Sequence, residues 1–311
     1  MTDIWRGKRI VVTGGGGFIG RRLVEMLTST RAIDVDQVFV PRSVDYDLRV
    51  LDAAVEATRN ADIILHLAAD VGGLPYSTNH HAFQFRNNSL IDLQVIEAAR
   101  VNNVTKIVNT SSACAYPRDA EYPLTEDQLY TGLPQESNRG YGLAKRMTVN
   151  LSRFYQREHG VNAVTVIPTN AYGPGDDFDL SKCHVIPAMI RKCHETDRID
   201  VWGDGSATRD FLFVDDFANG IIRAAEALEG PEPVNLGSGH EISIKNLVNL
   251  VAELCQFRGE LHFDASRPAG QPRRVLDIAS ASDRMGWQPM TELRSGIERT
   301  ISWFRENVQE S

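Results

Sequence analysis

The sequence places a serine, a tyrosine and a lysine where they could act together on a carbonyl group. Tyr141 and Lys145 are four positions apart in a segment with helical spacing, so their side chains share one face. Ser112 ends a strand-like run, and ligands of parallel sheets bind beyond the carboxyl ends of strands. The reference pKa of tyrosine is about 10, and a neighbouring ammonium lowers it by favouring the phenolate. Ser112 could hydrogen-bond the carbonyl oxygen. The alternative is a surface tyrosine beside a solvated lysine.

A glycine-rich turn near the start of the chain has the context of a dinucleotide-binding fingerprint. A short apolar strand, 9–13, precedes the turn, and Leu23, Val24 and Leu27 follow it at helical spacing. Glycines allow the tight turn, leave room for a pyrophosphate and let the helix pack closely on the strand. The first helical N–H groups then face the phosphates. We expect cofactor contacts at Gly14, Gly17, Phe18, Ile19 and Gly20, the alternative being an ordinary flexible loop.

The second predicted strand, 37–40, bears on the choice between NAD and NADP. A carboxylate at the end of this strand would bind the ribose 2′-OH, whereas an arginine would accommodate a 2′-phosphate. Asp34 and Asp36 lie before the strand, and Arg42 follows it. We therefore expect NADP(H) as cofactor with Arg42 as a ligand, the alternative being a solvated loop residue. The next strand, 62–69, ends in small residues, so the cofactor can lie close to the backbone at Ala68.

Strands alternate with helices as far as residue 168. One helix carries Ile91 and Val95 on a face, and another, from about Tyr141 to Gly160, carries Leu143, Met147, Leu151 and Phe154. Strands are expected at 106–112 and 164–167. This alternation predicts an α/β protein with a doubly wound parallel sheet of the Rossmann type. The loop-rich stretch that follows predicts a second, smaller α/β substrate domain. We assign residues 1–169 and 210–234 to the NADP-binding domain, and residues 170–209 and 235–311 to the substrate domain.

Composition argues against several classes of function. The net charge of -8 is unfavourable for nucleic acid, because phosphate backbones select basic surfaces. The sequence contains no apolar run of about 18 residues, so no membrane span is expected. The N-terminal segment also lacks the pattern of a signal peptide. We therefore expect a cytoplasmic protein whose cysteines are free thiols. Cys183-His184 and Cys193-His194 do not have the usual spacing of zinc ligands, so no metal site is expected.

These motifs together resemble the extended short-chain dehydrogenases/reductases. The shared marks are Thr13 to Gly20, Ser112, and Tyr141 to Lys145. Within that family, narrower marks resemble the enzymes that epimerise and reduce GDP-4-keto-6-deoxymannose. These narrower marks are residues 71–73, 112–117, 168–170, 184–187, 201–203, Arg209 and 263–266. The resemblance covers nearly the whole chain, and it adds Pro168 and Asn170 to the expected cofactor contacts, beside Tyr141 and Lys145.

The resemblance also implies an epimerisation pair, Cys114 and His184. Enzymes of this kind use a cysteine and a histidine to move protons before NADPH reduces the keto group. A keto group at C4 acidifies the protons on C3 and C5, and a thiol and an imidazole are suited to exchange them near neutral pH. The alternative is that Cys114 is a small buried residue in a tight loop and that His184 makes a structural hydrogen bond.

Nucleotide-sugar contacts are implied at Val71, Gly72, Gly73, Asn170, Lys192, Trp202, Arg209 and Arg274. Arg209 would pair with the diphosphate, since arginine suits phosphate geometry; the alternative is an ion pair with Asp210. Lys192 and Arg274 depart from the pattern, which has arginine and lysine there, so charge is kept while hydrogen-bond geometry changes. The resemblance further implies a homodimer formed through helices that flank the active site.

The hypothesis from the sequence is an enzyme that epimerises and reduces a nucleotide-4-keto-6-deoxysugar with NADPH, most simply a GDP-sugar. One alternative is a related enzyme for another base or sugar, or one that reduces without epimerising. Another is a non-catalytic NADP(H)-binding regulator. A broken Ser–Tyr–Lys set would mark such a regulator, and here Ser112, Tyr141 and Lys145 are all present.

Overall fold

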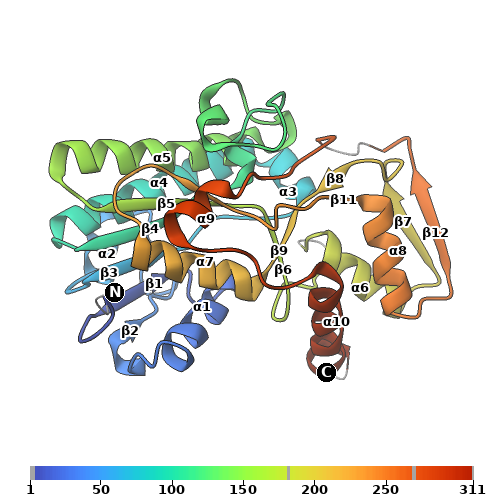
Figure 1. Ribbon diagram of the computed structural model, residues 1–311, viewed down its shortest axis with the longest axis horizontal. Coiled ribbons are helices and arrows are strands. Elements are labelled where there is room, and N and C mark those ends of the chain that lie inside the picture. Colours follow the sequence, from blue (N-terminus) through green and yellow to red (C-terminus); the bar gives the residue numbers. More distant parts are fainter. Residues whose placement is uncertain (1–3, 181–182, 268–270, 310–311) are drawn as a thin grey trace.

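The computed structural model describes residues 4–180, 183–267 and 271–309. Its centre is a parallel sheet of six strands (Figure 1). The strands, in spatial order, are β2 (Val38–Phe39), β1 (Ile10–Thr13), β3 (Ile63–His66), β4 (Lys106–Thr110), β5 (Ala163–Pro168) and β10 (Val234–Leu236). β1 lies between β2 and β3, so strand order reverses there and opens a crevice at the carboxyl edge. The glycine-rich turn begins at this point.

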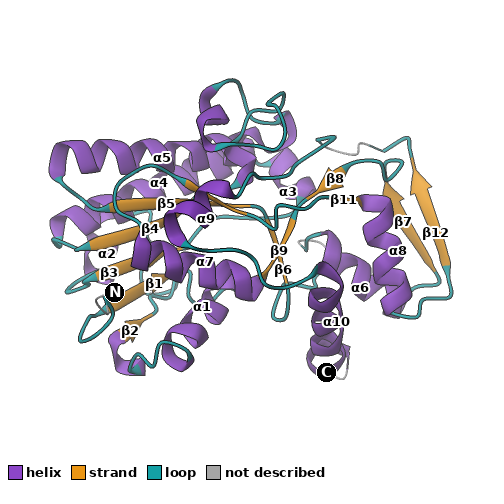
Figure 2. Ribbon diagram, in the orientation of Figure 1, coloured by secondary structure: helices purple, strands orange, loops and turns teal. Residues whose placement is uncertain are grey.

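Helices cover both faces of the sheet (Figure 2). Ile10 and Val12 of β1 pack with Leu23, whereas Val11 packs on the opposite face with Val95. One layer contains α1 (Phe18–Ser29), α7 (Val214–Ala227) and α9 (Ala279–Met285), and the other contains α2 (Leu51–Ala57), α4 (His81–Val101) and α5 (Arg139–His159). The doubly wound fold predicted from the sequence is confirmed. No helix within the described ranges is long and apolar enough to cross a bilayer.

Only part of the apolar stripe predicted for α5 packs on the sheet, where Leu151 contacts the core. Phe154 is 57% exposed, and Leu143 and Met147 are half-buried. The buried residues of α5 are mostly small or polar instead: Gly140, Gly142, Ala144, Lys145, Thr148, Val149 and Ser152. Helical periodicity showed which residues share a side of α5, but it did not show which side is buried. The buried side carries small residues because α5 packs closely against its neighbours there. Lys145 therefore lies on the buried side of the helix.

A smaller α/β region lies to one side of the sheet (Figure 1). β7 (Arg198–Trp202) pairs in parallel with β12 (Glu260–Asp264), and α6 (Val185–Glu195), α8 (Ile244–Leu254) and α10 (Leu293–Phe304) share its core. The short pairs are β6 (Asn170–Tyr172) with β9 (Phe211–Phe213), and β8 (Thr208–Arg209) with β11 (Ile242–Ser243). Further short elements are α3 (Leu74–Asn79), η1 (Val35–Gln37), η2 (Ala113–Ala115), η3 (Glu126–Tyr130), η4 (Glu136–Asn138) and η5 (Arg305–Gln309).

Two segments bear on the expected domain boundaries. β10 runs to Leu236 and pairs with β5, so the parallel sheet extends past the boundary expected at residue 234. Helix α9, which we placed in the substrate domain, packs on the sheet side, where Ala281 joins the same core as Leu236. The chain thus returns to the sheet region near its end. The division into two domains itself stays a prediction.

Candidate active site

The predicted serine and tyrosine meet at the carboxyl edge of the sheet. Ser112 follows β4 and caps the 3-10 helix η2, where its Oγ accepts a hydrogen bond from Cys114 N at 3.2 Å. Tyr141 lies in the first turn of α5 and shares a hydrogen bond with the Ser112 side chain. A side chain at Gly142 would collide with the Cys114 carbonyl oxygen, so glycine permits this close approach. The fold thus brings Ser112, Cys114 and Tyr141 together.

Tyr141 is held as a neutral phenol. Burial raises its pKa, the charge of Cys114 and then that of Asp92 act in the same direction, and the Ser112 hydrogen bond opposes them. Lys145 is directed elsewhere, because its Nζ lies 3.2 Å from each carboxylate oxygen of Asp92. Our expectation that Lys145 lowers the phenol pKa is therefore wrong for this arrangement. A protonated phenol is the form that can give a proton to a carbonyl oxygen during reduction.

The glycine-rich turn has the shape expected of a pyrophosphate site. Gly14 has a φ of 71°, and a Cβ there would lie 2.8 Å from Ala68 N, so the turn rests against the end of β3. A Cβ at Gly20 would collide with the Gly14 carbonyl oxygen. Gly17 caps α1 without a side-chain hydrogen bond, which leaves the N–H groups at Phe18 and Ile19 available. These features fit a dinucleotide with its phosphates at the start of α1.

Arg42 lies over the same turn. A Cβ built on Gly16 would lie 3.0 Å from Arg42 Nη1, and the Arg42 side chain is exposed. Asp34 precedes β2, where it caps η1 by accepting from Asp36 N. A guanidinium beside the pyrophosphate turn fits the extra phosphate of NADP(H). At the other side of the crevice, Pro168 ends β5, and Asn170 donates from Nδ2 to the Asp210 carbonyl oxygen at 2.9 Å.

Cys114 has two polar neighbours besides the serine–tyrosine pair. Asn138 Nδ2 lies 3.1 Å from its Sγ atom, and Arg274 Nη1 lies 3.4 Å from it. Arg274 is itself held through Nε and Nη2 by the Gln271 side-chain oxygen, at 3.2 and 3.0 Å. Hydrogen-bond donors of Asn138 and Arg274 therefore lie against the Cys114 sulfur.

Arg209 is available for an anion. Its Nη1 donates to the Thr208 carbonyl oxygen at 2.7 Å, and burial together with the Arg274 charge lowers the pKa of Arg209 to about 10. Asp210, the alternative partner, accepts from the backbone N–H groups of Ser238 and Leu276 instead. Burial raises the pKa of Asp210 to about 6. Two arginines held close together need a polyanion, and a diphosphate has the required charge and geometry.

The other predicted residues lie on separate elements. His184 is the N-cap of α6 and remains accessible to solvent, while the surrounding protein lowers its pKa by desolvation and the Asp177 charge opposes this. Lys192, also on α6, is half-buried. Trp202 ends β7, is 45% exposed and lies under the Arg267 guanidinium at 5.2 Å. Across the described chain, no direct contact joins these residues to Cys114 or Tyr141, so a bound ligand would have to span the gap.

The segment Val71–Gly73 follows β3 at the same edge. Val71 is 59% exposed, and Gly73 is the N-cap of α3. The preceding residue, Asp70, connects the segment to α4 and α3, because its carboxylate accepts hydrogen bonds from Asn87 Nδ2 of α4 at 2.9 Å and from Tyr76 Oη of α3 at 3.0 Å. Of these three residues Val71 is exposed, whereas Gly72 is half-buried and Gly73 is buried.

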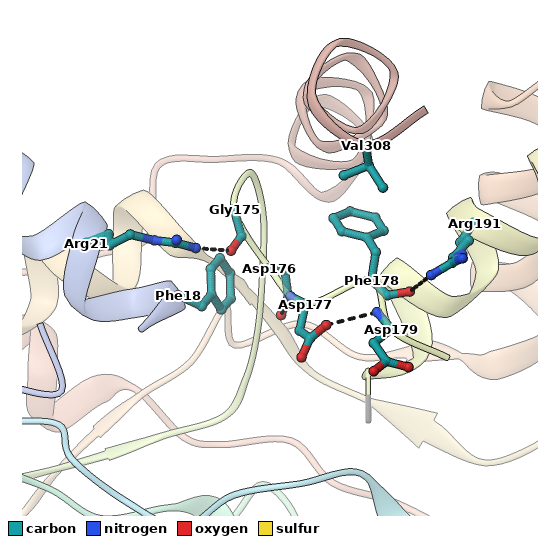
Figure 3. Close-up of a pocket in the computed structure, with 9 residues that line it drawn as sticks. All are labelled: Phe18, Arg21, Gly175, Asp176, Asp177, Phe178, Asp179, Arg191 and Val308. Atoms are coloured by element: carbon teal, nitrogen blue, oxygen red, sulfur yellow. Dashed lines mark hydrogen bonds between the residues drawn. The ribbon is translucent and has the colours of Figure 1, made fainter. Parts of the chain in front are cut away.

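A separate pocket lies beside the N-terminal end of α1 (Figure 3). The loop 175–179 forms much of its wall, held by Arg21 Nη2 on the Gly175 carbonyl oxygen at 2.9 Å and by Arg191 Nη1 on that of Phe178 at 3.0 Å. Burial raises the pKa of Asp176, in this loop, to about 7. The Phe18 side chain lines this pocket rather than the crevice, so only its backbone is suited to the cofactor.

Sequence reasoning missed three polar residues that support the site: Asn138, His66 and Asp92. Asn138 contacts Cys114, and His66 Nε2 lies 3.1 Å from the Asp92 carboxylate beside Lys145. A signal was present for Asp92. Gln84, Asn88 and Asp92 recur every four residues and are all buried on α4. Polar residues on a buried helical face indicate a hydrogen-bonded network.

The Ser–Tyr–Lys set at the carboxyl edge of a doubly wound sheet, beside a glycine-rich first turn, defines a short-chain dehydrogenase/reductase. The chain belongs to the NAD dependent epimerase/dehydratase family, whose model matches residues 10–237. This confirms the family resemblance.

Individual relatives match over nearly their whole lengths. The probable GDP-L-fucose synthase 1 of Oryza sativa subsp. japonica is 35% identical over 97% of this chain and 94% of its own. The GDP-L-colitose synthase of Yersinia pseudotuberculosis is 32% identical over 95% and 97%. Among solved structures, a GDP-L-fucose synthetase from Naegleria fowleri bound to NADP has 29% identity and a TM-score of 0.87, covering 98% of this chain and 95% of its own.

Proposed function

We propose that the protein is an NADPH-dependent 3,5-epimerase/4-reductase of a nucleotide-4-keto-6-deoxyhexose, and specifically a GDP-L-fucose synthase. The observation that carries this proposal is the position of Cys114, which lies beside the Ser112–Tyr141 pair and within 3.4 Å of Arg274. A simple reductase has no use for a thiol at this place. The names of the similar proteins support a GDP-sugar as the substrate.

Two groups of residues would have separate tasks: one would exchange protons on carbon, and the other would protonate the C4 oxygen. Cys114 and His184 would remove and return protons on C3 and C5, which the C4 keto group acidifies. Ser112 would hydrogen-bond the C4 oxygen, and Tyr141, kept protonated, would donate to it. The bound NADPH supplies the hydride for C4; the turn 14–20, Arg42, Ala68, Pro168 and Asn170 would hold it. Arg209 and Arg274 would bind the diphosphate, with Trp202, Lys192 and residues 71–73 around the rest of the substrate.

Turnover of a defined substrate panel tests this assignment. The panel contains the GDP-, UDP- and dTDP-linked 4-keto-6-deoxyhexoses, each with NADPH and with product stereochemistry read by NMR. The proposal expects preferential consumption of GDP-4-keto-6-deoxymannose and inverted configuration at C3 and C5. Tyr141→Phe serves as the control that binds NADPH without reducing the ketone. Reduction with both centres unchanged would favour a plain 4-reductase, and NADPH binding without turnover of any panel member would favour a non-catalytic regulator.

We further propose a cytoplasmic homodimer. Support for the dimer comes from exposed aromatic side chains on the outer helices: Phe83 and Phe85 of α4 are 51% and 43% exposed, and Phe154 of α5 is 57% exposed. A second copy of the chain could bury these rings by pairing α4 and α5 with their equivalents. Support for the compartment is that all four cysteines are free. The mass in solution, measured by light scattering for the unaltered chain and for Phe154→Glu, decides the dimer.

A further inference from the structure

The side chain of Arg274 is held from one side by a neutral amide. The Oε1 atom of Gln271 accepts hydrogen bonds from Arg274 Nε at 3.2 Å and from Nη2 at 3.0 Å. Gln271 and Arg274 are 5% and 8% exposed, so both groups are buried. The other terminal nitrogen of the guanidinium, Nη1, lies 3.4 Å from Cys114 Sγ. Gln271 therefore occupies one edge of the guanidinium and leaves the nitrogen beside the sulfur uncovered.

The partners of Gln271 determine the direction of its amide. Its Nε2 atom donates to Tyr122 Oη at 2.7 Å and to the Arg118 carbonyl oxygen at 3.3 Å. A guanidinium can only donate and a carbonyl oxygen can only accept, so the reversed amide would place donor against donor and acceptor against acceptor. Arg118 and Tyr122 lie between η2 and η3, in the loop that follows Cys114 along the chain. Gln271 thus joins that loop to Arg274.

The backbone brings Arg274 next to Arg209, but the direction of the side chain has to be set separately. Arg274 N donates to the Thr208 carbonyl oxygen at 3.2 Å, and Asp210 N donates to the Arg274 carbonyl oxygen at 2.9 Å. These bonds align residue 274 with β8, which carries Arg209. Burial lowers the pKa of Arg209, and the Arg274 charge acts in the same direction, so the two guanidinium groups repel each other. Without the acceptor on Gln271, the Arg274 side chain would be free to turn away from Arg209.

We propose that Gln271 is a positioning residue for the substrate site, and that its amide oxygen holds Arg274 with its remaining donors toward the diphosphate. This inference rests on the proposed function, because it takes the diphosphate of a nucleotide-sugar as the anion that Arg274 binds. Within the described ranges, two N–H groups of Arg274 bond Gln271 and one lies against Cys114, which leaves the others for a phosphate. The sulfur is a weak acceptor, so the amide is the stronger of the two anchors.

A neutral acceptor suits this position better than a charged one. A carboxylate would also hold the guanidinium, but its charge would cancel that of Arg274. The amide forms its hydrogen bonds without removing charge, so Arg209 and Arg274 both stay available to a polyanion. Asp210 is not such a partner, because its carboxylate accepts from the backbone N–H groups of Ser238 and Leu276.

The test is a double-mutant cycle on GDP binding, measured by calorimetry. Gln271→Met removes the hydrogen bonds of the amide but nearly keeps its volume. It is compared with the unaltered protein, with Arg274→Met and with the variant that carries both substitutions. Gln37→Met is the matched control, since Gln37 is half-buried at the amino end of β2 and donates from Nε2 to the Lys8 carbonyl oxygen at 3.0 Å. KM for the nucleotide-sugar and KM for NADPH are measured on the same variants.

Gln271→Met should weaken GDP binding about three- to tenfold, because an arginine that is not held in advance must be ordered when the ligand binds. KM for the nucleotide-sugar should rise by the same factor, whereas KM for NADPH should stay unchanged, and Gln37→Met should alter neither. In the Arg274→Met background the second substitution should have little further effect, since Gln271 then has no guanidinium to hold. Equal weakening in both backgrounds, or full GDP affinity of a folded Gln271→Met protein, would overturn the proposal.

GDP binding separates this inference from the assignment of the reaction. If the unaltered protein binds GDP but turns over no 4-keto sugar, the proposed function fails and the cycle still decides the role of Gln271. If turnover is as proposed but the cycle is additive, the inference alone fails. Absence of GDP binding by the unaltered protein would overturn the inference as well. If Gln271→Met does not fold, Gln271→Asn takes its place, because the shorter amide stays polar but cannot reach both Tyr122 and Arg274.

Discussion

Arg274 Nη1 lies 3.4 Å from Cys114 Sγ, so an arginine expected at the diphosphate also contacts the cysteine expected to exchange protons. Arg274 is 8% exposed and is anchored by Gln271. With the proposed roles of these two residues, substrate binding and proton exchange would be coupled through one side chain. A nucleotide-sugar that engages Arg274 would have its sugar delivered next to the sulfur.

Arg274→Lys should raise KM for the nucleotide-sugar about tenfold, the ~1.4 kcal/mol expected from one lost charge-assisted hydrogen bond. A lysine has one donor group and cannot contact Gln271, Cys114 and a phosphate together. Steady-state kinetics at saturating NADPH measure the change. Arg273→Lys is the control, since Arg273 is exposed and pairs with Glu241. Equal KM values for both variants would remove Arg274 from the substrate site.

Arg209→Met should stabilise the protein while weakening nucleotide binding. Burial and the Arg274 charge lower the pKa of Arg209 to about 10, so the folded state disfavours its charged form. Arg209 is charged in both the folded and the unfolded chain near neutral pH, so burying this charge lowers the free energy of unfolding there. The destabilisation decreases only when the pH rises above the lowered pKa of the folded state. We expect Tm to rise by about 2 °C and calorimetric binding of GDP to be lost. A lower Tm with intact GDP binding would contradict the diphosphate role.

The sequence predicted the sheet well, and it identified Ser112, Tyr141 and Lys145 as candidates, because both depend on local pattern. Strand–turn–helix order identified the glycine-rich turn, and the spacing of Tyr141 and Lys145 gave their common face. The environment of these residues depends on contacts distant in the chain. Lys145 meets Asp92, which lies 53 positions earlier, and no spacing rule links such residues. Burial of the phenol, the main cause of its raised pKa, likewise depends on the assembled fold and not on local spacing.

The exposure of the α5 stripe could also not be predicted from the local sequence pattern. Leu143, Met147 and Phe154 share a face by helical geometry, yet packing against α4 and η2 selects small residues such as Gly140 and Gly142 for the buried side. The outward exposure of part of this stripe could be recognised only after the fold was in place. For His184 and Cys114 the outcome differs. The resemblance identified both residues, but no information on the distance between them came from the sequence.

Cofactor preference should follow Arg42. NADPH should be used in preference to NADH, and Arg42→Ala should narrow the preference about tenfold or more, mainly through KM for NADPH, because one phosphate contact is lost. The guanidinium lies over Gly16 and has no part in the fold of the sheet, so stability should change little. Arg49→Ala is a matched control, as Arg49 is exposed and pairs with Asp47. Equal kcat/KM for both cofactors in the unaltered enzyme would defeat this reading.

The most direct test of the epimerase/reductase account is the reaction of GDP-4-keto-6-deoxymannose with unlabelled NADPH in D₂O. The account predicts deuterium at C3 and C5 of the product and light hydrogen at C4. Cys114→Ser should lose most of this exchange, since a serine hydroxyl is a far weaker base than a thiolate, yet retain some direct reduction through Ser112, Tyr141 and Lys145. His184→Gln should alter which stereoisomer accumulates. Product from the unaltered enzyme with no deuterium at C3 or C5, while substrate is consumed, would contradict the account and leave Cys114 and His184 as structural residues.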